Sequence, residues 1–108
     1  MTIQEKLEHL IRKMNENPTD LNGLEATYTF ELTDKEEIFS IVFQNEEVTY
    51  HSEPLEEQDC LLKMNENNFD KLIDGNLNAT SAFMMGKIKA KGDLTYALKL
   101  QNVLGNYR

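Results

Sequence analysis

Only a few residues in this sequence have the types and spacing that catalysis requires. His51 stands two positions before Glu53 and could support general acid–base chemistry, but no third group at a suitable spacing completes a triad or a metal site. Cys60 alternates with apolar residues, which predicts a buried, inert thiol rather than a nucleophile. His9 falls on the polar side of a helical pattern, so we expect it at the surface.

The sequence also lacks the short motifs that hold phosphates, nucleophiles or metal ions. It contains no glycine-rich phosphate loop and no Gly-x-Ser-x-Gly elbow, and its single cysteine excludes an internal disulfide and a multi-cysteine metal site. The acidic pairs near the expected turns lack the regular spacing of a calcium loop. We therefore predict no catalytic residue, no cofactor and no metal site.

Charge is distributed unevenly along the 108 residues, whose formal net charge is −8. Residues 1–59 contain 15 acidic and four basic residues, whereas residues 60–108 contain four acidic and seven basic ones. The overall acidity argues against general nucleic-acid binding. Lys87, Lys89, Lys91 and Lys99 form either a solvated face or a rim that attracts carboxylates, phosphate groups or an anionic membrane surface.

Hydrophobic periodicity predicts the elements that would position these residues. Apolar residues at helical spacing predict a first helix over residues 3–16, with Thr2 as its cap. Alternating apolar residues predict four strands, over residues 24–32, 38–44, 48–52 and 60–64. Because these strands follow one another closely, we expect three or four of them to form an antiparallel meander.

After Met64 the apolar period changes from that of strands to that of helices. Two short helices are predicted after Asn65 and Asn78, followed by a strand over residues 87–91 and a final helix that begins after Gly92. The final helix is apolar on two sides, so we expect both sides to be covered by protein or by a ligand.

The methionines allow two interpretations. Met64, Met84 and Met85 lie close in sequence to other apolar residues of the second half. Methionine is an ordinary filler of irregular core space, and it also lines apolar pockets that adapt to their ligands. Both interpretations stay open at the level of sequence.

Length and composition indicate one domain over residues 1–108. The order of elements predicts an α+β fold: a five-stranded, mostly antiparallel sheet with helices packed on one face. No apolar run approaches the roughly 20 residues of a membrane span, and the first residues lack the apolar centre of a signal peptide. We therefore expect a cytoplasmic protein.

Residues 75–94, continuing into residues 97–101, closely resemble the sterol carrier protein type-two family. The residues that carry the resemblance are Gly75, Leu77, Asn78, Ala82, Phe83, Gly86, Lys87, Ile88, Lys89, Gly92, Asp93, Lys99 and Leu100. Two positions depart from the family pattern. Ala79 replaces the usual proline, and Met85 replaces a polar residue that is often glutamine, which favours a plain acyl chain over a sterol hydroxyl.

The resemblance implies an apolar tunnel, enclosed by the helices and the sheet, that holds a fatty acid, a fatty acyl-CoA or a sterol without catalysing a reaction. By position it implies a tunnel lining of Phe83, Met84, Met85, Ile88, Leu94, Leu98, Gln101, Leu77 and Phe30. We expect a lipid carrier that is a monomer or weak dimer and has no nucleic-acid partner. Lys87, Lys89 and Lys91 are expected to make transient contact with a membrane surface.

Two functions of other classes remain open. A lipid-free interaction or dimerisation module on the same fold would use the second apolar face of the final helix as its interface. An acyl-CoA thioesterase would need His51 and Glu53 as its acid–base pair.

Overall fold

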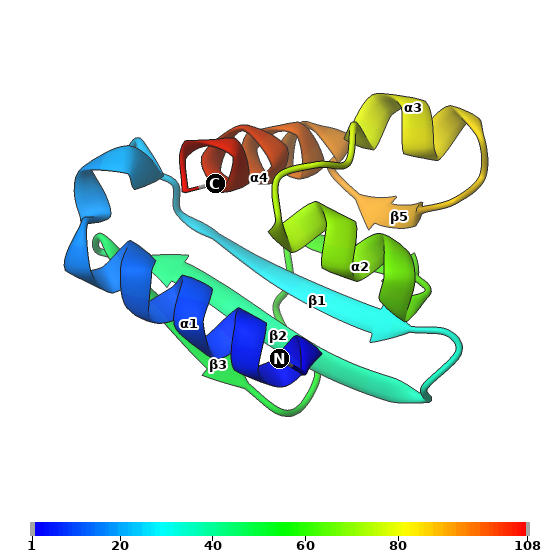
Figure 1. Ribbon diagram of the computed structural model, residues 1–108, viewed down its shortest axis with the longest axis horizontal. Coiled ribbons are helices and arrows are strands. Elements are labelled where there is room, and N and C mark those ends of the chain that lie inside the picture. The colour runs from blue at the N-terminus through cyan, green and yellow to red at the C-terminus, as the bar shows by residue number, and fades with distance from the viewer. Residues whose placement is uncertain (1, 108) are drawn as a thin grey trace.

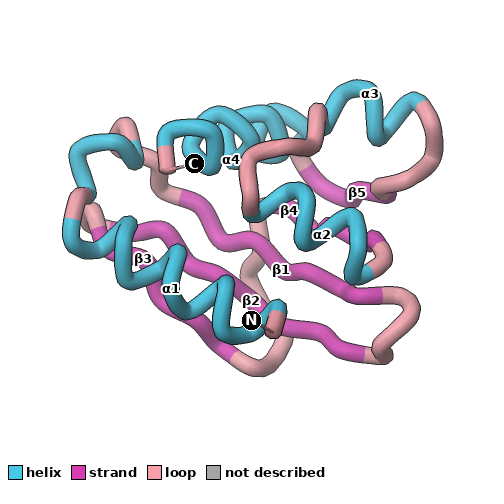
Figure 2. The backbone as a smooth tube through the Cα atoms, viewed as in Figure 1, coloured by secondary structure: helices cyan, strands magenta, loops and turns pink. Residues whose placement is uncertain are grey.

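The computed structural model, which describes residues 2–107, has a helical layer on one face of a five-stranded sheet (Figures 1 and 2). The elements, in chain order, are α1 (Ile3–Glu16), the 3-10 helix η1 (Pro18–Leu21), β1 (Ala26–Leu32), β2 (Glu37–Gln44), β3 (Glu47–His51), β4 (Cys60–Met64), α2 (Glu66–Ile73), α3 (Ala79–Met84), β5 (Lys89–Gly92) and α4 (Leu94–Asn106). The α+β class and the first helix are as predicted. No helix within residues 2–107 has the length and apolar character to cross a membrane.

The strand order in the sheet is β3-β2-β1-β4-β5. Three of the four pairings are antiparallel, but β4 runs parallel to β1, with Tyr28 opposite Cys60. The predicted antiparallel meander is therefore confirmed for β1, β2 and β3, and β4 does not belong to it. After β3 the chain crosses the sheet, and β4 pairs with β1 instead of with β3.

The crossing segment lies over the sheet face opposite the helices. Thr29 and Ser40 point to that face, yet both are fully buried. Their hydroxyl groups lie 3.0 Å apart, and the Ser40 hydroxyl donates to the backbone oxygen of Glu53 at 2.8 Å. At the end of the crossing, the Thr27 backbone N–H donates to the Asp59 carboxylate at 2.8 Å. These hydrogen bonds satisfy polar groups that burial would otherwise leave without partners.

The last strand is shorter than the predicted range of residues 87–91 and begins two residues later, at Lys89. The Lys87 backbone N–H still donates to the Ala82 carbonyl at 2.8 Å, so Lys87 completes the end of α3 instead of pairing with β4. Gly86 makes this ending possible with a φ of +72°, a conformation that glycine adopts without strain.

Aromatic and aliphatic side chains on the inner face of the sheet form the core. Phe30 and Phe39 lie on neighbouring strands, and Phe69 of α2 covers both, with ring centroids 5.3 Å from each. Tyr28 is also buried, and its hydroxyl donates to the Tyr96 carbonyl oxygen of α4 at 2.6 Å. The core thus holds α2 and α4 against the central strand.

Helix α4 is covered on one side only. Ala97, Leu100, Val103 and Leu104 are buried against the rest of the chain. Leu94 and Leu98 are not covered by the described residues, and their coverage by a ligand stays a prediction.

Candidate functional site

An apolar cavity of about 20 Å³ lies where α1, α2 and α4 meet the inner face of the sheet. Its lining is entirely apolar and consists of Leu7, Leu10, Ile11, Met14, Phe30, Ile41, Phe43, Phe69, Leu72, Ile73, Leu100 and Leu104. Ligand pockets usually measure about 300–1,000 Å³, so this cavity is too small for a lipid chain as the structure shows it. Helix α1 would have to move away from α2 and α4 to admit a lipid chain.

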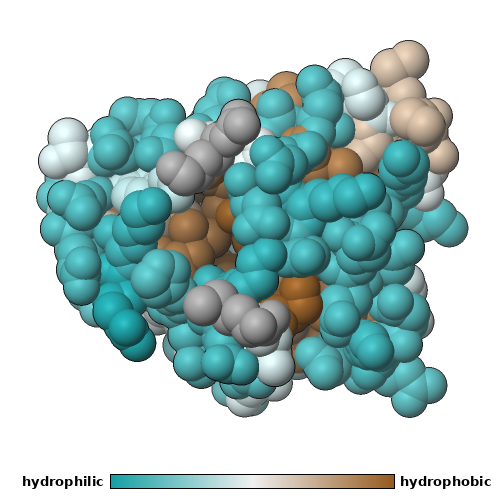
Figure 3. All heavy atoms as spheres, viewed as in Figure 1, coloured by the Kyte–Doolittle hydropathy of each residue, from teal (hydrophilic) through white to brown (hydrophobic). Residues whose placement is uncertain are grey.

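A wider pocket of about 400 Å³ lies directly above this cavity, between α1 and the end of α2. Leu10 and Ile73 line both spaces and therefore separate them. Figure 3 shows a hollow between α1, α2 and α4 with apolar side chains at its floor. Lys6, His9 and Lys13 of α1 line one side of the upper pocket, and Asp74 also lines it, so the apolar space lies beneath an opening with basic side chains and one carboxylate.

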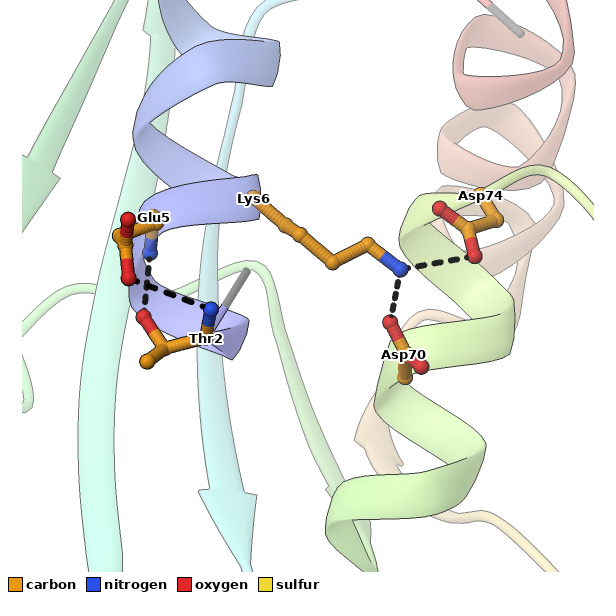
Figure 4. Close-up of polar contacts among 5 residues, drawn as sticks. All are labelled: Thr2, Glu5, Lys6, Asp70 and Asp74. Carbon is orange, nitrogen blue, oxygen red and sulfur yellow. Dashed lines mark hydrogen bonds and ion pairs between the residues drawn. The ribbon is translucent and has the colours of Figure 1, made fainter.

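Lys6 connects α1 to α2 beside this opening (Figure 4). Its ammonium group contacts the Asp70 carboxylate and lies 2.9 Å from the Asp74 carboxylate. The hydrogen bond with Asp70, followed by the one with Asp74, holds the pKa of Lys6 above its ordinary value. At the start of α1, the capping box of Thr2 and Glu5 fixes the helix that carries Lys6.

Lys13 and Tyr107 form a second connection, between α1 and the end of α4. The Lys13 ammonium group donates to the Tyr107 carbonyl oxygen at 2.9 Å. The Tyr107 hydroxyl group in turn donates to the Asn17 carbonyl oxygen. These two bonds, together with those of Lys6, hold the edges of the opening in place.

The residues predicted from the family resemblance occupy several environments. Phe30 lines the cavity, Ile88 is buried, and Leu77 and Phe83 pack against the core while partly exposed. The Gln101 side chain accepts a hydrogen bond from the backbone N–H of Ala79 and so joins α4 to the first turn of α3.

Four other predicted residues form a set that we call the exposed apolar set. Met84 is 84% exposed, Met85 68%, Leu94 52% and Leu98 42%. They come from the end of α3 and the first two turns of α4, and Figure 3 shows apolar atoms at the surface over α3. The structure therefore does not place them around the cavity that Phe30 lines.

The predicted lysines lie away from the cavity. Lys89 and Lys91 flank the inward-facing Ala90 on β5, and both are exposed. Lys87 and Lys89 line a separate open pocket of about 590 Å³ that has no lining residue in common with the apolar cavity. Lys99 lies over the Tyr96 ring, 5.0 Å from its centroid.

Of the groups considered for catalysis, His51 and Cys60 lie outside both spaces of the candidate site, whereas His9 lines the upper pocket. The His51 ring contacts the Thr49 hydroxyl at 3.2 Å on an edge strand. Cys60 is fully buried, and burial, followed by the charges of Asp93 and Asp59, raises its pKa to about 11, so the thiol stays protonated at neutral pH. Among residues 2–107, no three His, Cys, Asp or Glu side chains are grouped as metal ligands.

Sequence reasoning missed Lys6, His9 and Lys13 as parts of a site. It placed His9 at the surface, which the structure confirms. The available signal was the spacing of three and four residues, which puts three basic side chains on one stripe of α1 beside its apolar face. Nothing local indicated that this stripe would face Asp70, Asp74 and Tyr107.

Comparisons with known proteins agree with this architecture. The model of the SCP-2 sterol transfer family matches residues 7–105. Hydroxysteroid dehydrogenase-like protein 2 of Xenopus laevis is 31% identical over 105 residues, which cover 95% of this chain and 25% of that protein. The chain thus spans about a quarter of the length of that relative.

Two solved structures share the fold across most of both chains. The sterol carrier protein domain 2 of Helicoverpa armigera has a TM-score of 0.66 at 24% identity and covers 94% of this chain and 86% of its own. The palmitated SCP2L2 of Aedes aegypti has a TM-score of 0.70 at 16% identity. The match covers 96% of this chain and 95% of the Aedes aegypti chain. The chain belongs to the SCP-2 sterol transfer family, a family of lipid-binding and lipid-transfer domains.

Proposed function

We propose that this protein is a non-enzymatic lipid carrier that holds one long acyl chain between α1, α2, α4 and the inner face of the sheet. The observation that carries the proposal is the apolar cavity beneath a pocket with basic side chains, in a member of a lipid-transfer family. The candidate lipids are a fatty acid, a fatty acyl-CoA or a sterol-like molecule. Burial contributes roughly 0.8 kcal/mol for each methylene group, so a long chain binds without many polar contacts.

The cavity of about 20 Å³ is too small for an acyl chain, so the proposal requires it to widen on binding. Filling it requires α1 to separate from α2, and the two helices are joined at the opening by the exposed contacts of Lys6. Exposed ion pairs stabilise a protein by at most about 1 kcal/mol each, whereas an acyl chain of many methylene groups offers far more. The palmitated neighbour from Aedes aegypti also supports an acyl chain as the ligand.

The residues predicted from the family resemblance define a second location for the acyl chain. Lipid bound there would contact Met84 and Met85 at the other side of α4. Methionine methyl NMR distinguishes the two locations, because Met14 lines the cavity and Met84 and Met85 are exposed. We expect added palmitate to shift the Met14 methyl signal. Shifts confined to the methyl signals of Met84 and Met85 would instead indicate that the lipid binds at α3 and α4.

Native mass spectrometry of protein purified from cells tests the function itself. We expect a mass increment that matches a bound lipid, or a complex after palmitate is added to stripped protein. Protein that stays empty under both conditions contradicts the carrier function.

We further propose that Lys87, Lys89 and Lys91 make transient contact with anionic membranes during lipid exchange. All three are exposed, which supports the proposal. Co-sedimentation with vesicles that contain phosphatidylserine tests it, and replacement of the three lysines by glutamine is expected to reduce the bound fraction.

A second candidate function is a lipid-free interaction module. The exposed apolar set of Met84, Met85, Leu94 and Leu98 favours it, because such side chains are often covered in an interface. The oligomeric state in solution distinguishes this function from that of a carrier.

A further inference from the structure

The pocket above the apolar cavity differs electrostatically from the other opening near the same cavity. Lys6, His9 and Lys13 line the first pocket, together with Asp74. A second pocket, of about 260 Å³, reaches the cavity lining at Leu7. Its lining includes Glu37 and Glu66 and, among the described residues, no basic side chain. An anionic group is therefore favoured at the first opening and disfavoured at the second.

The basic residues of the first pocket are not equally available to a ligand. Lys6 is already neutralised by Asp70 and Asp74. The Lys13 ammonium group contacts only the Tyr107 carbonyl oxygen among residues 2–107, so two of its three N–H donors can serve a ligand. His9 is exposed one helical turn before Lys13.

Two side chains separate this pocket from the cavity in the core. Leu10 and Ile73 line the pocket and the cavity alike, and Phe30 lies deeper in the cavity lining. An amphiphile whose polar end contacts Lys13 would therefore place its chain between Leu10 and Ile73. Asp74 also lines the pocket, and its repulsion grows with the number of negative charges on the head group, so a single carboxylate is favoured over a head group with several charges.

We propose that this pocket is the head-group site of the carrier: Lys13 and His9 bind the carboxylate of a single-chain fatty acid whose acyl chain enters the cavity between Leu10 and Ile73. The inference rests on the proposed function and specifies its ligand as a singly charged carboxylate. It places the head group on α1 and not at the lysines of β5.

Calorimetric titration with palmitate and with 1-hexadecanol separates head-group recognition from chain burial. We expect Lys13→Gln to weaken palmitate binding about tenfold, because a hydrogen bond to a charged group is lost, and to leave hexadecanol binding unchanged. Lys13→Arg is expected to restore palmitate binding, since it keeps the charge. His9→Gln should give a smaller loss for palmitate alone.

Lys89→Gln is the matched control, because Lys89 is an equally exposed lysine outside both spaces. Loss of palmitate affinity in Lys89→Gln but not in Lys13→Gln overturns the head-group site, as does an equal loss for both lipids in Lys13→Gln. In either case lipid still binds and the carrier function stands. A wild-type protein that binds neither lipid overturns the function together with the site.

Discussion

Gly92, at the end of β5, has a backbone conformation that other residues adopt only with strain. Its φ is +102°, and a Cβ atom at this position would lie 2.5 Å from the Asp59 carbonyl oxygen. The close approach occurs where β5 pairs with β4, with Gly92 opposite Cys60. We predict that Gly92→Ala lowers the free energy of unfolding by roughly 1–3 kcal/mol, measured by urea denaturation.

Gly105 provides the control for this prediction. It lies within α4, and a Cβ atom there would meet no other atom within 4 Å. Gly105→Ala is therefore expected to raise the free energy of unfolding by about 0.5–1 kcal/mol. Equal effects of the two substitutions would show that Gly92 is under no special constraint.

The buried thiol of Cys60 makes stability depend on alkaline pH. Its pKa rises from an ordinary value of 9.0 to about 11 in the folded protein, chiefly because of burial. Between these values the unfolded chain loses the thiol proton while the folded chain keeps it. The contribution to stability is thus complete below pH 9 and is lost as the pH rises towards 11.

We therefore predict that wild-type stability falls more steeply from pH 9 to pH 11 than that of Cys60→Ala. Urea denaturation at intervals across this range measures both slopes. Burial also raises the pKa of Tyr28, and this contribution of burial is common to both proteins. Parallel slopes would mean that Cys60 ionises as easily in the folded state as in the unfolded one.

At the scale of elements, the proposed function requires the contact between α1 and α2 to open before a lipid enters the cavity. Lys6 is the residue of α1 that pairs with carboxylates of α2 across the opening. We predict that Lys6→Met lowers the free energy of unfolding by less than about 1 kcal/mol, because the pair is partly exposed and the aliphatic stem is retained. The same change should speed the release of a fluorescent fatty acid, measured by stopped flow.

Lys71→Met is the appropriate control, since Lys71 is an exposed lysine of α2 outside this ion pair. It is expected to leave the release rate unchanged. Identical release from the Lys6 variant and the wild type would show that lipid leaves without separating α1 from α2.

The agreement between sequence and structure also varies from element to element. Helix α1 begins and ends as predicted because its cap, its apolar stripe and Pro18 are all local signals. The fifth strand begins later than predicted because Lys87 is used to end α3, a competition that alternation alone does not reveal. The lipid contacts assigned to Met84 and Met85 remain a prediction.

For the whole molecule, the oligomeric state separates the two proposed functions. The exposed apolar set contains four side chains, which is a small patch compared with the total of roughly 1,200 Å² that stable interfaces bury. We predict a monomer at micromolar concentration, measured by gel filtration with light scattering. A dimer that Leu98→Lys dissociates would favour the interaction module instead.

The helices, most of the strands, the α+β class and the family could all be identified from patterns within the sequence. Periodicity, caps and motifs are properties of neighbouring residues, so they can be recognised without knowledge of the fold. The same local reading divided the net charge of −8 into an acidic first half and a basic second half. The family resemblance placed all the expected ligand contacts except Phe30 in the second half.

Only the tertiary structure placed β4 beside β1 and brought Lys6, His9 and Lys13 of the acidic half against Ile73, Asp74 and Tyr107. These residues are separated by more than half the chain. Their meeting depends on how α1, α2 and α4 pack on the sheet, which no local pattern encodes. The basic opening therefore lies in the half of the sequence whose net charge pointed away from it.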